Sequence, residues 1–168
     1  MNRLSHPLLI TFCSLLIGIG ASAQVVEQAT PDDRVSLIGE QEETFAALSV
    51  SHPGILLGVC GNDMDYAYEK WMIMLGAMED YAEAIGYDIQ GLKTYMYVYW
   101  NADGTIAHLA FFPKTKSRNI PIADLRTFFS GFVETYQMQI KTEEGFSHYG
   151  SAAFPTFARP EYKVRRND

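Results

Sequence analysis

Cys60, His108 and His148 are the first candidates in this sequence for covalent or acid–base chemistry. A cysteine attacks as its thiolate and therefore needs a nearby base or positive charge. No motif places either histidine beside Cys60, and the acids at Asp63 and Asp65 favour the protonated thiol. We therefore predict that Cys60 is buried and inert, and we keep catalysis by Cys60, His108 or His148 as the alternative.

The same histidines form no recognisable metal motif. Short-range zinc sites use patterns such as HxH or HExxH, and neither pattern occurs around His108 or His148. The sequence also contains no GxGxxG or P-loop pattern that would indicate a nucleotide cofactor. We therefore expect no metal and no cofactor. If Cys60 is inert, as predicted, we also expect no catalytic residue.

The carboxylates have simpler explanations than acid–base catalysis. Asp63 and Asp65 stand at the start of a predicted helix, where acids accept hydrogen bonds from free backbone N–H groups. The pair Glu143 and Glu144 lies in a polar loop. The acids within the helix after Asp63 are predicted to form a solvated face: Glu69, Glu79 and Glu83.

Aromatic side chains gather between residues 95 and 112 and suggest a binding surface. Tyr95, Tyr97 and Tyr99 alternate along an extended segment and share one side of it, whereas Trp100 falls on the other side. Exposed rings give a large contact area at low entropy cost. The candidate binding residues are Tyr95, Tyr97, Tyr99, Trp100 and His108. In the competing interpretation, helices cover one face of the sheet and a terminal segment covers the other.

A hairpin between two helices must position these residues. Two segments are rich in β-branched and aromatic residues and are predicted to be strands, 94–100 and 105–112. The sequence between them, Asn101–Gly104, favours a type I turn with Gly104 at positive φ. A last strand is expected within 137–140 or 147–157. Apolar residues recur at helical spacing in two segments, the first with Tyr68, Trp71, Leu75, Met78, Ala82 and Ile85, the second with Ile122, Leu125, Phe129, Phe132 and Tyr136.

This order of elements predicts an α+β fold, in which two amphipathic helices pack on one face of a small antiparallel sheet with a central hairpin. Residues 45–158 are expected to form a single domain. Residues 24–44 are interpreted as a flexible acidic lead-in with a short ordered piece at 35–38, and residues 159–168 as a frayed tail.

The first 23 residues have the layout of a secretory signal peptide: Arg3, an apolar run from Leu8 to Ile19, and a small-x-small triplet ending at Ala23. The apolar run is shorter than the roughly 20 residues that span a bilayer. Cleavage after Ala23 would leave Cys60 without a partner for an internal disulfide. We predict a periplasmic or secreted protein with no membrane span after cleavage.

Charge gives a further exclusion. The formal net charge is −7, whereas a protein that binds nucleic acid needs a basic face. The one basic cluster, at Lys114, Lys116 and Arg118, is interpreted as a solubilising loop. We therefore expect no nucleic-acid partner.

Residues 81–157 resemble the C-terminal domain of TonB-type energy-transducing proteins. The resemblance covers "AIGYDIQGLKTYMYVYWNADGTIAHLAFF", then "IADLRTFFSGFVETY", then "SHYGSAAFPTF". That family has the order helix, Gly-containing lead, strand, Asp-Gly turn, strand, helix and strand. Its members usually also have a Tyr-Pro pair at the first helix, a membrane anchor and a proline-rich spacer. These three features are not found in this sequence. The resemblance implies an exported fold whose exposed sheet edge could accept a strand from a partner.

These observations together predict an exported, non-catalytic binding or scaffold domain of the cell envelope that uses a sheet edge or an aromatic sheet face. The expected partner is an envelope protein or peptide, held by strand addition. A homodimer formed through the hairpin is another arrangement. The alternative from a different class is a small secreted enzyme that uses Cys60 or a histidine-containing cleft.

Overall fold

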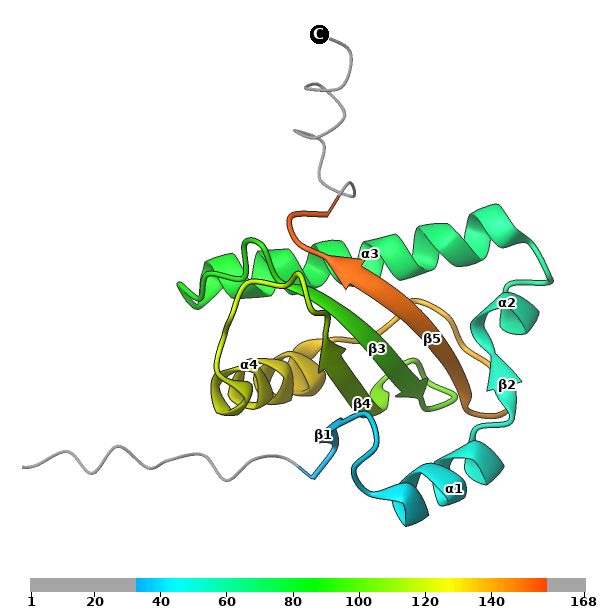
Figure 1. Ribbon diagram of the computed structural model, residues 1–168. Helices are drawn as coiled ribbons and strands as arrows, with labels where there is room; N and C mark the ends of the chain where they lie inside the picture. Colours follow the sequence, from blue (N-terminus) through cyan, green and yellow to red (C-terminus); the bar gives the residue numbers. More distant parts are fainter. Residues whose placement is uncertain (1–32, 157–168) are drawn as a thin grey trace, which may run out of the picture.

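The computed structural model describes residues 33–156, which form four helices and a five-stranded sheet (Figure 1). The predicted signal peptide, most of the lead-in and the predicted tail lie outside these residues. No helix between residues 33 and 156 is long and apolar enough to cross a membrane.

Helix α3, Met64–Ala84, confirms the first predicted helix. The side chain of Asp63 caps it by accepting a hydrogen bond from the N–H of Tyr66 over 3.0 Å. Four of the six predicted face residues are buried, namely Trp71, Leu75, Met78 and Ala82. Tyr68 and Ile85 are exposed, because Tyr68 lies at the margin of the apolar stripe and the helix ends before Ile85.

The predicted hairpin is confirmed as strands β3, Lys93–Trp100, and β4, Ile106–Pro113. Between them the N–H of Gly104 donates to the carbonyl of Asn101 over 2.9 Å, and Gly104 has a φ of +89°. Asp103 accepts hydrogen bonds from the backbone N–H and the hydroxyl of Thr105. The turn therefore combines a glycine at positive φ with a local side-chain cap.

Helix α4, Ile122–Thr135, and strand β5, Phe146–Ala153, complete the predicted order. Phe129 of α4 lies against Phe111 of β4, with ring centroids 4.8 Å apart. Of the two segments considered for the last strand, the later one forms β5, which pairs antiparallel with β3. In the earlier segment, Gln137 makes only an isolated bridge to Thr105.

The predicted α+β class is confirmed, but the sheet is mixed rather than antiparallel and residues 33–156 form four helices rather than two. The strand order is β1-β4-β3-β5-β2, and the edge strands β1, Val35–Leu37, and β2, Gly54–Ile55, pair parallel with β4 and β5. The two additional helices are α1, Glu42–Ser51, where the pattern did not decide between helix and strand over residues 45–50, and α2, Leu56–Val59, where a short strand or a lead into the next helix was expected. Strands of two or three residues show no alternating pattern, and their parallel pairing depends on partners that are distant in sequence.

The sheet has two different faces. Met96, Val98 and Trp100 point toward α3 and α4 and are 0% exposed. The tyrosines of β3 point to the opposite face, which α1 covers at one end. Phe45 of α1 lies there with its ring centroid 6.0 Å from those of Tyr97 and Tyr99. The core is therefore closed on the helix face and only partly covered on the other.

Candidate binding site at the sheet edge and the aromatic face

The structure records no contact among the three candidate catalytic residues. Cys60, just after α2, is 6% exposed, and its burial raises the thiol pKa. His108 and His148 point to opposite faces of the sheet, because they pair with the adjacent β3 residues Tyr99 and Val98. No constellation of a thiol and an imidazole results, so nothing in this geometry favours the enzyme alternative.

His108 instead forms a buried hydrogen bond with Ser36 of β1, with 2.9 Å between the serine Oγ and the Nε2 atom. A serine–histidine contact can be a nucleophile–base pair. Here the two residues are 0% and 2% exposed, and Phe45 stacks edge-on against the imidazole. A substrate could not reach this pair, so we interpret it as a polar contact that joins β1 to β4.

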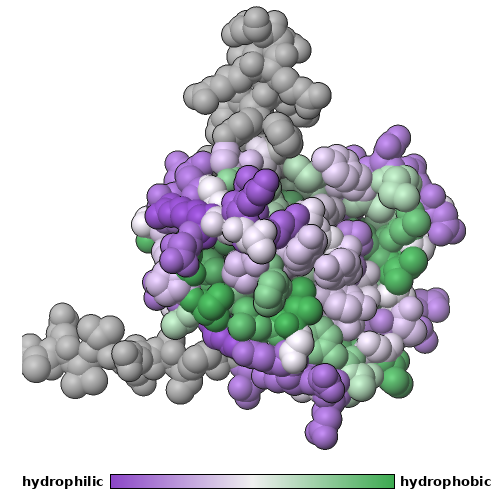
Figure 2. Space-filling model, in the orientation of Figure 1, coloured by the Kyte–Doolittle hydropathy of each residue, from purple (hydrophilic) through white to green (hydrophobic). Residues whose placement is uncertain are grey.

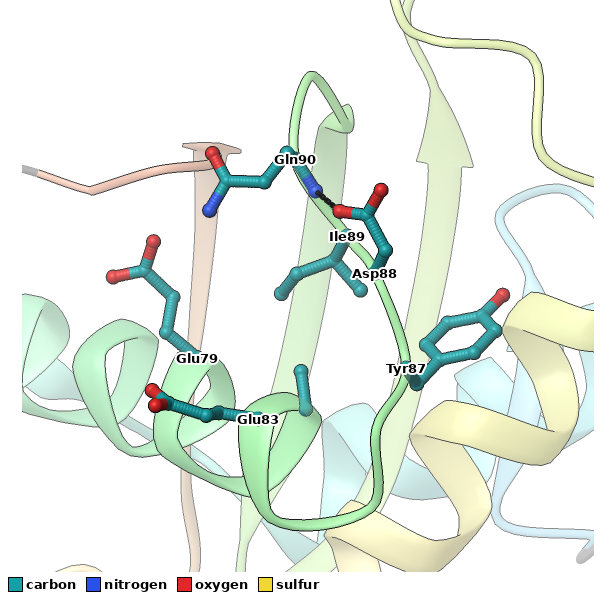
Figure 3. A pocket seen from close by; sticks show the side chains of 7 residues that line it. Glu79, Glu83, Tyr87, Asp88, Ile89 and Gln90 are labelled. Carbon is teal, nitrogen blue, oxygen red and sulfur yellow. Dashed lines mark hydrogen bonds between the residues drawn. The ribbon is translucent and has the colours of Figure 1, made fainter.

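Carboxylates of α3 and the loop after it line a pocket of about 330 Å³ (Figure 3). Glu79 is only 4% exposed and accepts hydrogen bonds from the N–H and the hydroxyl of Thr156. Asp88 accepts from the N–H of Gln90, which together with the nearby Arg118 lowers the pKa of Asp88. The prediction that Glu79 faces solvent was wrong, since its carboxylate anchors the chain that follows β5.

These acids do not amount to a metal centre. Among residues 33–156, no group of three or more histidine, cysteine, aspartate or glutamate side chains is arranged to hold a metal ion. Asp63 caps α3 as expected, and Glu143 and Glu144 are exposed in the loop before β5.

The accessible aromatic residues of the sheet lie on its face opposite α3 and α4. We call this surface the aromatic face and define it by Tyr95, Tyr97, Tyr99, Phe112 and Tyr149. Tyr95, Phe112 and Tyr149 are 41%, 52% and 56% exposed, and Tyr95 stacks on Tyr149 with centroids 6.0 Å apart. Figure 2 shows apolar surface in the middle of the view, over β4, with hydrophilic residues around it.

Three of the five predicted binding residues are out of reach of a partner. Tyr99 and Trp100 are 0% exposed and His108 is 2% exposed. Trp100 stacks on Phe146 within the core on the helix face. Tyr99 lies under α1, and its burial raises its pKa to about 12. Tyr95 remains exposed and Tyr97 partly so.

Tyr149 is the exposed aromatic residue that sequence reasoning missed. It stands directly across from Tyr97 in the register of β3 and β5. Gly150 weakened the strand pattern around it. The alternation in "SHYGSA" was nevertheless a usable signal, because it places His148 and Tyr149 on opposite faces.

Among residues 33–156, one edge of β5 has a neighbouring strand only at its first two residues. β2 pairs only with Phe146 and Ser147, whereas all eight residues of β5 pair with β3. The N–H of Phe154 donates to Leu92 on the β3 side, so by the antiparallel alternation the backbone groups of Tyr149, Ser151 and Ala153 point away from β3. We call residues 148–153 on this outward side the free edge.

The opposite edge of the sheet is closed by side chains. Arg126 of α4 donates to the outward carbonyl of Val35, and Glu40 accepts from the outward N–H of Leu37. Arg126 and Glu40 also form an ion pair, which lowers the pKa of the Glu40 carboxyl. Proteins commonly protect sheet edges in this way, because unpaired strands recruit other chains. No side chain of residues 33–156 makes a comparable contact with the outward backbone groups of the free edge.

Comparisons with known proteins give no relative: no protein-family model, no curated protein and no solved structure matches this chain. The assignment of this site therefore depends on its geometry alone.

Proposed function

We propose that this chain is an exported, non-catalytic binding or scaffold domain of the cell envelope, and that it holds a partner polypeptide by strand addition at the free edge of β5. The observation that carries the proposal is the contrast between the two sheet edges. The edge of β1 is closed by Arg126 and Glu40, whereas the outward backbone groups of Tyr149, Ser151 and Ala153 have no strand partner among residues 33–156. Main-chain hydrogen bonds of this kind bind an extended segment without a special side-chain motif.

The aromatic face supports the same proposal. Tyr149 belongs to the free edge, and Tyr95 stacks on it from the neighbouring strand. The ammonium of Lys114 lies 4.5 Å from the ring centroid of Tyr95. An added strand would place alternate side chains on this face, where the exposed rings offer contact area.

Export is part of the proposal and depends on the predicted signal peptide. It implies that the protein recovered from the periplasm or the medium begins at Gln24. N-terminal sequencing of that fraction tests this, and a chain that still begins at Met1 in the cytosol would refute it.

Site-specific photocross-linking in cells tests the binding role. A photoreactive phenylalanine analogue in place of Tyr149 should yield a discrete adduct with an envelope protein. The same analogue in place of Tyr66, which is 40% exposed on α3, should not yield that adduct.

A second variant makes the test specific for the edge. Ser151→Pro removes an outward N–H, whereas Ser151→Thr keeps it. The adduct should be lost with proline and retained with threonine, provided that both variants unfold at similar denaturant concentrations. Equal adducts at positions 149 and 66, or adducts that survive the proline, would contradict the proposal. An adduct of two copies of this chain would indicate the homodimer instead.

A further inference from the structure

A small apolar pocket lies where α2 and the start of α3 meet β5. Its volume is about 200 Å³. Sites for drug-sized ligands usually enclose about 300–1,000 Å³, so this pocket has room for little more than one side chain. Apart from the His148 imidazole and the Tyr68 hydroxyl, its lining side chains are apolar. The lining residues are Leu57, Met64, Ala67, Tyr68, Trp71 and His148.

The pocket is continuous with the free edge. His148 is the first β5 residue beyond the pairing with β2, and it faces the helix side, where its ring lies 4.8 Å from that of Trp71. The chain leaves the edge after Ile55, because Leu56 begins α2. A strand that continues along β5 from that point therefore passes the pocket, and its side chains on the helix face would point toward it.

The mouth of the pocket is apolar and is flanked by acids. Met64 and Tyr68 are 66% and 59% exposed. Asp65 and Glu69 follow them by one residue each, so they lie on the adjacent stripe of α3 and are also exposed. Lys70 nearby forms no ion pair with either acid in the described part of the chain; its ammonium lies over the Tyr66 ring, 4.7 Å from the centroid. The surface thus combines an apolar cavity with negative charge.

We propose that this pocket binds one apolar side chain, leucine or phenylalanine in size, from an extended partner segment that also carries lysine or arginine beside that residue. This inference depends on the proposed strand addition and adds its side-chain specificity. The free edge would supply the hydrogen bonds, the pocket would select the anchor residue, and Asp65 and Glu69 would favour a basic flank.

Titration calorimetry of the full exported chain with synthetic peptides tests the proposal. The probe is the capped peptide Val-Thr-Lys-Thr-Leu-Thr-Lys-Thr-Val, which places the leucine and both lysines on one side of a strand, with a lysine next to the leucine in each direction. Two matched peptides carry aspartate in place of the central leucine or glutamate in place of both lysines. The first peptide should bind at least about tenfold more tightly than either of the others, which is about 1.4 kcal/mol.

Two protein variants separate the pocket from the edge. Ala67→Leu fills the cavity and should weaken binding of the probe at least about tenfold, whereas Ala84→Leu, at the exposed far end of α3, should not change it. Ser151→Pro should also weaken binding. Urea unfolding of each variant shows whether it is folded.

The outcomes discriminate between the two ideas. If Ser151→Pro abolishes binding while Ala67→Leu and the aspartate peptide have no effect, strand addition stands and the pocket inference is wrong. If the probe does not bind, or binds equally to all variants, both ideas fail. If the unliganded chain is a dimer that Ser151→Pro dissociates, a second copy occupies the edge, which also overturns the inference.

Discussion

Gly104→Ala tests how the central hairpin is locked to the chain that follows α4. Gly104 has a φ of +89°, and a Cβ atom at this position would lie 2.1 Å from the carbonyl oxygen of Met138 and 3.0 Å from that of Ile140. The N–H of Met138 donates to the carbonyl of Gly104 over 2.8 Å. The two backbones therefore cannot separate without losing this hydrogen bond.

The expected cost in free energy of unfolding has three parts. A left-handed backbone costs an L-residue about 1–2 kcal/mol. Loss of the Met138 hydrogen bond costs about 0.5–1.5 kcal/mol. Met138 and Ile140 are 2% and 9% exposed, and partial exposure of both side chains costs about 1–2 kcal/mol more. We expect Gly104→Ala to destabilise the fold by about 3–5 kcal/mol.

Gly86→Ala is the matched control. Gly86 has a φ of +69°, but nothing lies within 4 Å of a Cβ built there. Only the backbone term applies, so the expected loss is about 1–2 kcal/mol. Urea denaturation of both variants and the parent chain measures the two losses. If the losses in free energy of unfolding for Gly104→Ala and Gly86→Ala differ by less than about 1 kcal/mol, the close contact with residues 138–140 does not fix the hairpin.

Phe45→Ala removes the ring contacts of α1 with Tyr97, Tyr99 and His108, so we expect a loss of about 1–2 kcal/mol. Hydrogen exchange should accelerate in α1 but not in β3, and unchanged exchange in α1 would show that other contacts hold it. Burial lowers the pKa of His148 below its usual 6.5, so only the unfolded chain gains a proton as the pH falls below that value. The free energy of unfolding is therefore at its full value above pH 6.5 and declines below it. His148→Gln should reduce this decline between about pH 7.5 and 5.5. An equal decline in the parent and the variant would show that His148 is not responsible. Cys60 should react with a disulfide reagent on the order of 100-fold more slowly than in the urea-unfolded chain, because it is buried and its pKa is raised; similar rates would contradict its assignment as an inert core residue.

The hairpin and the two long helices were predictable because their signals are local. Alternation in β3, the Asp-Gly turn, and apolar residues at steps of three and four each depend on a few neighbouring residues. The buried positions Trp71, Leu75, Phe129 and Phe132 follow directly from those patterns. Register and turn chemistry then placed the tyrosines on one face.

The edge strands and the cover over the aromatic face were not predictable in this way. None of the ten residues of α1 is buried and its apolar residues form no stripe, so helical periodicity gives no signal there. Alternation assigns Tyr99 and His108 to a face, but it does not say that Phe45, more than 50 positions earlier, covers them. Similarly, the sequence around Glu79 is typical of an exposed acid on a helix. Only the tertiary structure brings Thr156 against it, where the Thr156 hydroxyl donates to the Glu79 carboxylate.

The same two consecutive elements, α1 and β2, determine which corner of the sheet stays open. α1 covers the face at Tyr99, and β2 pairs with the edge at Ser147, which stands opposite Tyr99 in the register of β3 and β5. At the other end of these strands Tyr95 stands opposite Ser151, and there no element of residues 33–156 covers the face or pairs with the edge. A single extended segment could therefore contact the free edge and the exposed rings together. If β2 paired with the other end of β5 instead, a partner would contact the exposed rings without free backbone groups beside them. If α1 covered the other end of the face, a partner would contact the edge without exposed rings beside it. Residues 42–55 therefore determine which corner of the sheet is covered by α1 and β2.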